Sequence, residues 1–516
     1  MIKRSDIFMS LISGILLIFA FPPYDYYPLA WFALVPFLIA IWNKKAKASF
    51  FLGILTGFSF FTGTLYWVFH SMYYYGNVPA AISTLILIVL CLYLSLYTGV
   101  FSTLLTLLSR NGAPPALFTV PALWVTLEYI RTYALTGVPW SILGYSQYKF
   151  LPFIQIADIT GIYGVSFIVA GVNGAIFDLY VSGPRKMGQM PLFSRLPTAI
   201  GIIVYIFVLI AVFAYGNWRI NESAEGQTIK ASVVQGNIAQ DSKWNPRFQK
   251  EVIDTYKKLT SRTLRESPEI IVWPESALPF VFGYDQKLTE EVLDFQKNTG
   301  TFLILGSVVV KEMTDNDTKL SNSAILLSPS GELLSVYDKI HLVPYGEYVP
   351  LKTVFPFVEK MVTAIGNFEP GHDTVVMNTP RAKIGNLICY EIIFPGLARK
   401  FVNNGANVLV TITNDAWFGR TSAPYQHFSM AVLRAVENRV PVVRSANTGI
   451  SGFIDAKGRI INKSDIFVEA TLTENISLGT EISFYTKYGD LFAFLCILST
   501  VLLVINRLFP EKKKAY

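Results

Sequence analysis

Charged residues and cysteine are scarce in this 516-residue chain. Only 15% of the residues are charged and 52% are hydrophobic, which is too apolar for an ordinary soluble protein and predicts membrane segments. The three cysteines, Cys91, Cys389 and Cys496, lie far apart, so the sequence predicts neither a disulfide framework nor a thiolate metal site. Because Cys91 and Cys496 fall in long apolar segments, Cys389 is the cysteine that belongs to a water-soluble region.

Common catalytic and nucleotide-binding motifs are missing as well. The chain has no HExxH, GxxxxGK[ST] or GxSxG motif and no GxGxxG after a strand, so zinc proteolysis, nucleotide binding and serine hydrolysis lack their usual fingerprints. It has only four histidines, and His70 lies in an apolar segment. A cysteine nucleophile in this chain would therefore need a base other than histidine.

Apolar stretches long enough to cross a bilayer recur along the chain. We count eight, seven before one long polar region and one after it, at about residues 6–22, 28–43, 48–70, 79–108, 115–134, 160–182, 196–216 and 489–508. If the N-terminus is cytoplasmic, lysine and arginine concentrate in the segments on the inner side. The positive-inside rule then places residues 217–488 on the non-cytoplasmic face.

The formal charge of +7 belongs to the membrane region. Outside residues 217–488 the chain has 15 basic and 7 acidic residues, whereas that region has 28 basic and 29 acidic ones. Basic charge therefore reports membrane topology, and the main argument for nucleic-acid binding disappears.

Residues 217–488 alternate short β-branched runs with helical stretches. Runs such as "EIIVWPESAL", "FLILGSVVV" and "ANVLVTITND" predict strands, "LSPSGELLSVYDK" predicts a hairpin, and helices are expected at about 246–265, 286–299, 395–404 and 424–439. This alternation predicts an α/β domain. We therefore expect a seven-helix transmembrane region at 1–216, the α/β domain at 217–488, and a final transmembrane helix with a basic tail at 489–516.

Cys389 follows the strand-like run "KIGNLI" and precedes the helical stretch "FPGLARKFVNNG". A single cysteine at the end of an apolar strand is more often a buried core residue than a nucleophile. On a strand-to-helix turn, however, it would lie near the N–H donors of a helix N-terminus, which favour a thiolate. The residues around Cys389 leave both interpretations open.

Two more residues could serve a reactive cysteine. Glu275, in "IIVWPESALP", follows an apolar strand and is either a helix cap or a general base whose proton affinity is raised by burial. Lys339, in "YDKIHLVPYGEYVP", is either a solvated lysine or a cation that stabilises an oxyanion and lowers a thiol pKa. Glu347 could orient Lys339 or form an ordinary loop salt bridge.

Together these residues resemble the Glu-Lys-Cys triad of the nitrilase superfamily, in the same order and with spacings of 64 and 50 residues. The motifs "WPESALP", "HLVPYGEYVPL", "CYEIIFP" and "TNDAWFG" resemble its apolipoprotein N-acyltransferase branch, and the likeness extends over the membrane segments. The resemblance implies a four-layer αββα sandwich. It also implies that Glu275, Lys339 and Cys389 are catalytic.

The resemblance further implies the reaction and its setting. An acyl chain would pass from a phospholipid, through a thioester on the cysteine, to the N-terminal cysteine α-amine of a diacylglyceryl apolipoprotein, without a cofactor or a metal. Tyr390 and Glu391 would support the site together with Glu347, and Trp244 and Trp417 would contact substrate. The implied location is the bacterial inner membrane, with the catalytic domain on the periplasmic face.

Two alternatives remain at this stage. A membrane-tethered nitrilase-type amidase would use the same triad with water in place of the lipoprotein amine, but it would leave the eight spans unexplained. A receptor or transporter would retain the fold without catalysis, and a transporter should carry paired charges within its helices. The one close pair, Glu128 with Arg131, lies near a helix end and is more typical of a structural role.

Overall fold

The computed structural model describes residues 1–109, 115–181, 192–223, 226–313, 318–344, 346–348 and 368–508. The chain forms two compact units, which are described separately below. The first comprises Met1–Tyr66, Thr84–Glu222 and Tyr488–Tyr516, and the second comprises Trp67–Ser83 and Ser223–Lys487. The segment Trp67–Ser83, expected with the membrane helices, thus clusters with the polar region, while the domain limits at 216/217 and 488/489 stay predictions.

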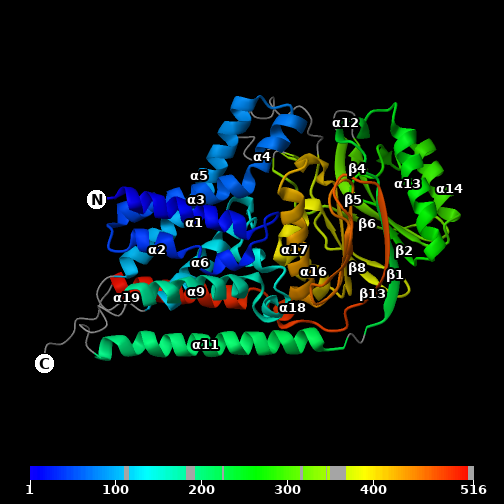
Figure 1. The fold of residues 1–516 in the computed structure, drawn as a ribbon. Helices are drawn as coiled ribbons and strands as arrows, with labels where there is room; N and C mark the ends of the chain where they lie inside the picture. The colour runs from blue at the N-terminus through cyan, green and yellow to red at the C-terminus, as the bar shows by residue number, and fades with distance from the viewer. Residues whose placement is uncertain are drawn as a thin grey trace. The chain divides into compact units, whose positions relative to one another are not determined.

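The first unit is helical (Figure 1). Its apolar sequence forms helices because a helix satisfies every backbone hydrogen bond within one segment, which is required in a hydrocarbon environment. The helices of this part of the chain are α1 (Arg4–Ala20), η1 (Tyr27–Trp31), α2 (Val35–Ile41), α3 (Ala46–Leu65), α5 (Ala80–Leu108), α6 (Ala116–Tyr133), η3 (Ala134–Thr136), η4 (Leu143–Gln147), α7 (Leu151–Ile154), α8 (Ala157–Thr160), α9 (Ile162–Val181), α11 (Leu192–Asn221) and α19 (Leu491–Leu508).

Five helices within the described residues are long and apolar enough to cross a membrane: Ala46–Leu65, Ala80–Leu108, Ile162–Val181, Ala199–Asn221 and Leu491–Leu508. The other three predicted spans are shorter or less apolar. Helix α1 has 17 residues, and the stretch expected at 28–43 is split into η1 and α2, each with a proline in its first turn. Helix α6 is less apolar because it contains Glu128 and Arg131. The protein is a membrane protein, and the count of eight spans is approximate.

The second unit contains two β-sheets. The seven-stranded sheet has the order β13-β1-β2-β4-β5-β6, with β3 paired to β4, and the six-stranded sheet has the order β12-β11-β10-β9-β8-β7. The strands are β1 (Thr228–Gln235), β2 (Ile270–Val272), β3 (Val281–Phe282), β4 (Phe302–Met313), β5 (Thr318–Leu327), β6 (Leu333–Asp338), β7 (Val376–Asn378), β8 (Lys383–Ile388), β9 (Val408–Thr413), β10 (Val442–Ala446), β11 (Gly452–Ile454), β12 (Ile460–Lys463) and β13 (Ala470–Ser477). The predicted hairpin is present, with β5 and β6 antiparallel and Gly331 at φ +80° in its turn.

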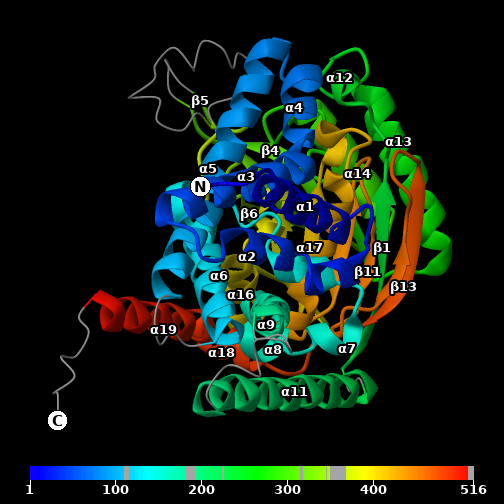
Figure 2. The same ribbon diagram turned by 60° about the vertical axis from the view of Figure 1, so that its left-hand side comes forward.

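Helices cover the outer face of each sheet, and this confirms the four-layer αββα arrangement (Figures 1 and 2). Helices α13 (Gln249–Thr263) and α14 (Gln286–Lys297) pack on the seven-stranded sheet, and α16 (Pro395–Asn403) and α17 (Ala423–Asn438) pack on the six-stranded sheet. The shorter helices are α4 (Trp67–His70), η2 (Ser71–Tyr75), α12 (Gln240–Lys243), η5 (Leu264–Glu266), η6 (Cys389–Ile393), η7 (Asp415–Phe418) and α18 (Phe484–Tyr488).

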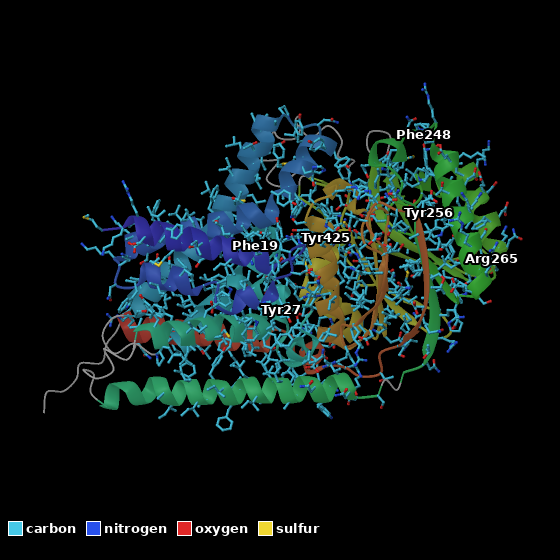
Figure 3. All side chains as sticks on the ribbon, in the orientation of Figure 1. Phe19, Tyr27, Phe248, Tyr256, Arg265 and Tyr425 are labelled. Atoms are coloured by element: carbon cyan, nitrogen blue, oxygen red, sulfur yellow. The ribbon has the colours of Figure 1, made fainter. Side chains whose placement is uncertain are left out.

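Packing between α13 and its sheet shows how the layers are held. Tyr256, labelled in Figure 3, lies on the buried face of α13 and stacks on Trp273, with ring centroids 5.1 Å apart. The indole of Trp273 donates to the hydroxyl of Thr260 at 2.8 Å. The inner faces of the two sheets meet at Ser445, whose hydroxyl lies near two carbonyl oxygens of the opposite sheet. The burial of apolar side chains on both faces of each sheet is typical of α/β layers.

The directions of the strands determine where the residues of the candidate site come together. Strands β1, β2 and β4 are mutually parallel, and two antiparallel pairings give β6 the same direction. In the other sheet β8, β9 and β10 are parallel. The residues that follow β2, β6, β8 and β9 therefore gather at the carboxyl ends of the strands, where open α/β sheets hold their ligands.

Candidate active site

Glu275 lies three residues beyond the end of β2, and both of its carboxylate oxygens are held. Oε1 accepts a hydrogen bond from Asn322 Nδ2 at 2.7 Å, and Oε2 accepts one from the backbone N–H of Asn414 at 2.8 Å. Gly306 of β4 permits this approach, because a Cβ atom there would lie 2.6 Å from the Cα atom of Glu275. The carboxylate is thus buried in a fixed orientation that both sheets determine.

Lys339 is the first residue after β6 and is buried between two carboxylates. Its Nζ atom lies 2.9 Å from Glu347 Oε1 and 3.4 Å from Glu275 Oε1. Its backbone N–H donates to the carbonyl oxygen of Asn322 at 2.8 Å, and the amide of Asn322 also donates to Glu347 Oε1 at 2.8 Å. The backbone N–H of Val343 fixes the other oxygen of Glu347 at 2.8 Å. The structure therefore brings Glu275, Lys339 and Glu347 together.

Cys389 lies on the turn between β8 and α16. It has a left-handed backbone conformation with φ +50°, which is strained for a residue with a side chain. The residue is 8% exposed and begins the short helix η6. The predicted strand-to-helix position is thus observed, and the thiol interacts electrostatically with Glu275 and Lys339.

Protonation states follow from burial and from these charges. Burial raises the pKa of the Cys389 thiol, and Glu275 raises it further, against a lowering by Lys339. Burial would also raise the pKa of Glu275, but the charge of Lys339 and the hydrogen bond from Asn322 hold it below its usual value. Burial would lower the pKa of Lys339, yet Glu347 and Glu275 raise it. At neutral pH the site therefore contains a thiol, a carboxylate and an ammonium group.

These directions bear on two possibilities that the sequence left open. The residues around Cys389 allowed either a thiol or a thiolate, and burial together with the charge of Glu275 favours the thiol. Burial was also considered as a cause that raises the proton affinity of Glu275. The net pKa of Glu275 is instead lowered, because the charge of Lys339 and the hydrogen bond from Asn322 outweigh burial, so Glu275 is present as a carboxylate.

Glu391 joins the cysteine turn to the loop that carries Lys339. Its Oε2 accepts from the backbone N–H of Ile388 at 2.7 Å. Its Oε1 accepts from the hydroxyl of Tyr337 at 2.8 Å and from the backbone N–H groups of Ile340 at 2.7 Å and His341 at 3.1 Å. Burial raises the pKa of Glu391 to about 7, against a lowering by its donors. Glu391 is thus a buried cross-link and does not face solvent.

The other predicted residues lie around this centre. The ring of Tyr390 meets that of Phe394 edge to face at 5.2 Å. Trp244 follows α12 and is 44% exposed, and Trp417 of η7 is 40% exposed. The ring of Trp417 lies 6.0 Å from that of Tyr75, which belongs to the segment that clusters with this unit. Both tryptophans thus leave part of a large apolar ring exposed.

Lys243 is a buried cation that the sequence analysis did not identify as part of the site. It is completely buried, and its Nζ donates to the backbone oxygen of Glu275 at 3.1 Å. Burial lowers the pKa of Lys243 to about 8, against raising by the charges of Glu275 and Cys389. Its sequence context, "SKWNP", is typical of a surface loop, so nothing in the neighbouring residues predicted that this lysine is buried at the site.

A second unpredicted group lies behind Cys389. Asp415 Oδ1 is 3.1 Å from His427 Nδ1, and Asp415 Oδ2 is 2.9 Å from an Arg444 nitrogen. His427 Nε2 lies 3.0 Å from the backbone oxygen of Cys389. Arg444 stands within the apolar run "VPVVRSA", and a charged residue inside a buried strand was the signal that could have revealed it.

Within the described ranges, no cluster of three or more histidine, cysteine, aspartate or glutamate side chains has a spacing that could hold a metal ion. The aromatic stretch 355–371, which has glycine and proline residues suited to hinges, is a candidate lid from the sequence, and its residues 355–367 lie outside the described part of the chain.

The sequence matches two family models: the apolipoprotein N-acyltransferase N-terminal domain over residues 13–175 and carbon-nitrogen hydrolase over residues 230–485. The apolipoprotein N-acyltransferase of Geobacter metallireducens is 42% identical over 96% of this chain and 94% of its own length. The chain belongs to the apolipoprotein N-acyltransferase family. The family's member from Pasteurella multocida is 32% identical over 94% of this chain and 92% of its own length. The resemblance noted from the motifs is confirmed.

Solved structures align with part of this apolipoprotein N-acyltransferase family member. A mutant amidase from Nesterenkonia sp. AN1 covers 49% of the chain and 92% of its own length, at 17% identity and a TM-score of 0.38. A Saccharomyces cerevisiae member of branch 10 of the nitrilase superfamily covers 57% of the chain and 98% of its own length, at 19% identity and a TM-score of 0.38.

Proposed function

We propose that this protein moves an acyl chain from a phospholipid to the N-terminal cysteine α-amine of a diacylglyceryl apolipoprotein, with Cys389, Glu275 and Lys339 as the catalytic residues. Membership of the apolipoprotein N-acyltransferase family supports acyl transfer in lipoprotein maturation and disfavours the amidase alternative. The observation that carries the mechanism is the buried Lys339 Nζ, held 3.4 Å from Glu275 beside the Cys389 turn.

The first half-reaction acylates Cys389. The Sγ atom attacks the ester carbonyl carbon of the phospholipid while Glu275 takes the thiol proton. Lys339 Nζ and the backbone N–H of Tyr390 stabilise the resulting oxyanion. An ammonium group has three donors, and two of those of Lys339 face Glu347 and Glu275, so one remains for the oxyanion. The C–O bond breaks, Glu275 returns the proton to the lysophospholipid oxygen, and a thioester is left.

The second half-reaction releases the acyl chain to the lipoprotein. An α-amino group has a pKa of about 8, so a substantial fraction is neutral near pH 7 and can attack the thioester. Glu275 takes a proton from the amine, the C–S bond breaks, and the proton passes to Sγ to restore the thiol. One substrate leaves before the other reacts, so the kinetics are ping-pong. Both substrates lie in a membrane, and tethering the domain there brings the reactants together.

Supporting residues keep this arrangement in place. Glu347 orients the ammonium group of Lys339, and Glu391 cross-links the cysteine turn to the lysine loop. Tyr390 contributes its backbone N–H, and the exposed rings of Trp244 and Trp417 contact the lipid substrates. The protein resides in the bacterial inner membrane with this domain on the periplasmic face, a placement that family membership and the positive-inside pattern support.

Acyl capture on Cys389 tests the mechanism. The full-length protein in detergent is incubated with a phospholipid labelled in its acyl chain, and label that neutral hydroxylamine removes is mapped by mass spectrometry. We expect the label on Cys389 in the parent and in Cys91→Ser and Cys496→Ser, the matched controls. Cys389→Ser should carry no such label. Equal label and turnover in Cys389→Ser and the parent would refute the mechanism.

Addition of the acceptor separates acyl transfer from hydrolysis. A diacylglyceryl peptide with a free N-terminal cysteine is added to the labelled protein after excess phospholipid is removed. The label should move to the peptide α-amine as a hydroxylamine-stable amide. Release of the label as free fatty acid at the same rate with and without the peptide would support the amidase alternative instead.

A further inference from the structure

The peptide group between Cys389 and Tyr390 has a partner on its carbonyl side. His427 Nε2 lies 3.0 Å from the backbone oxygen of Cys389. The carbonyl oxygen of Cys389 and the N–H of Tyr390 belong to one planar unit, so a contact that fixes the oxygen also fixes the direction of the N–H. Cys389 has φ +50°, a conformation that persists only when the surroundings determine it.

The hydrogen-bond partner of the His427 ring shows which ring nitrogen carries a hydrogen. A carbonyl oxygen only accepts hydrogen bonds, so Nε2 carries the hydrogen and donates it to Cys389 whether the ring is neutral or charged. Burial and the charge of Arg444 lower the pKa of His427, against a raising by Asp415. Nδ1 lies 3.0 Å from an Arg444 nitrogen and 3.1 Å from Asp415 Oδ1. In the neutral ring Nδ1 accepts from the guanidinium and in the charged ring it donates to the carboxylate, while Nε2 carries a hydrogen in both.

The ring and the two side chains that hold it come from three separate elements, and all three are buried. Asp415 of η7, His427 of α17 and Arg444 of β10 are each at most 1% exposed. The carboxylate of Asp415 accepts from Arg444 at 2.9 Å and from the hydroxyl of Thr413 at 2.8 Å. The guanidinium also donates to the backbone oxygen of Ile450 at 3.1 Å. The imidazole thus has little freedom to turn.

The hydrogen bond from His427 to the backbone of Cys389 distinguishes the Asp415, His427 and Arg444 network from ordinary core packing. Buried polar groups commonly satisfy one another, and Asp415 with Arg444 would do so without a histidine. Here the histidine extends the pair to the backbone of the residue that carries the thiol. A hydrogen bond to a carbonyl oxygen also polarises the peptide group, which strengthens the N–H as a donor.

We propose that His427 is a positioning residue for the oxyanion site, because it aims and polarises the Tyr390 N–H through the carbonyl oxygen of Cys389. The proposal rests on the proposed function, in which this N–H stabilises the oxyanion formed during acyl transfer. Asp415 and Arg444 hold the ring. His427 itself touches neither substrate nor the thiol proton.

Two reactions of Cys389 separate this role from a structural one. Acylation by phospholipid passes through an oxyanion, whereas alkylation by iodoacetamide displaces iodide at a saturated carbon and forms none. Both rates are measured on the full-length protein by mass spectrometry of the peptide that contains Cys389. The variants are His427→Leu, which lacks the donor, and His427→Gln, whose amide nitrogen can occupy the place of Nε2. His372→Leu is the matched control, since His372 is exposed.

We expect His427→Leu to slow acylation about 10- to 100-fold, in the range for loss of one oxyanion donor or below it. Its alkylation rate should stay within about twofold of the parent, in keeping with a role that acts only where an oxyanion forms. His427→Gln should recover most of the acylation rate, and His372→Leu should match the parent. If His427→Leu does not fold, His427→Asn replaces it, because its shorter amide reaches only the place of Nδ1.

Several outcomes would overturn the proposal. One is parental acylation in the variants without the donor. Another is an equal fall of acylation and alkylation, which would indicate general damage to the cysteine turn. A third is a glutamine variant as slow as leucine or asparagine. By contrast, a parent protein that alkylates at Cys389 but never acylates there would overturn the proposed function itself.

Discussion

Replacement of Lys243 by methionine is expected to stabilise the folded protein at neutral pH. Burial lowers the pKa of this lysine to about 8 from an ordinary value of 10.5. Since each pKa unit corresponds to about 1.4 kcal/mol, holding the charged side chain in this place costs about 3 kcal/mol at pH 7. Methionine has a similar length and carries no charge, so the Lys243→Met variant avoids that cost.

The lost hydrogen bond reduces this gain. Lys243 donates to the backbone oxygen of Glu275 at 3.1 Å, and leaving that buried acceptor unpaired costs about 1–3 kcal/mol. The net gain of Lys243→Met at pH 7 should therefore be about 0–2 kcal/mol. For a domain of this size, that corresponds to a rise in Tm of up to about 8 °C.

The pH dependence gives the sharper test. Below pH 8 the lysine is protonated in both the folded and the unfolded state, so its whole cost is present. Between about pH 8 and 10.5 the folded state releases the proton first, so the unfolded state binds more protons and the parent gains stability as pH rises. The variant lacks this gain. Its advantage should fall by about 3 kcal/mol over this window and change sign.

Thermal unfolding of the two full-length proteins in one detergent, at pH 7, 8, 9 and 10, measures the difference. Lys258→Met is the control, because Lys258 is an exposed lysine of α13 and its replacement should change neither Tm nor its pH dependence. A Lys243→Met variant that is less stable than the parent by the same amount at every pH would refute the reasoning. In that case burial of the charged lysine would not be lowering the free energy of unfolding.

Three further predictions concern the rest of the site. Glu391→Gln should lower the free energy of unfolding by about 1–3 kcal/mol, because its amide group would face the N–H of Ile388; an unchanged Tm would contradict this. Lys339→Met should slow acyl-enzyme formation about 100- to 1000-fold by removing an oxyanion donor, and single-turnover labelling within tenfold of the parent would exclude that role. Trp244→Ala and Trp417→Ala should each change stability by about 0.5 kcal/mol or less because the rings are partly exposed, yet raise KM for the lipid substrates about tenfold. A raised KM accompanied by a large fall in Tm would indicate a structural role for these tryptophans instead.

Much of the architecture could be predicted from local pattern. The alternation of β-branched runs and amphipathic stretches predicted the α/β layers, because strands and helices bury apolar faces with different periods. The turn at Gly331 and the strand-to-helix position of Cys389 were also predicted from the residues next to them in the sequence. The membrane helices were predicted less well. Prolines at the starts of η1 and α2 produced short helices where hydropathy alone suggested one span.

Amino-acid order by itself determined which segments are apolar, where the basic charge lies, and the motifs that contain Glu275, Lys339 and Cys389. Only the tertiary structure decided that Lys243 is buried beside Glu275, that His427 meets the carbonyl of Cys389, and that the free thiol stays protonated. Proximity between residues far apart in the chain, and the loss of water around them, arise when the two sheets pack together. Because electrostatic interactions depend on both, the chemistry of the site is a property of the folded layers.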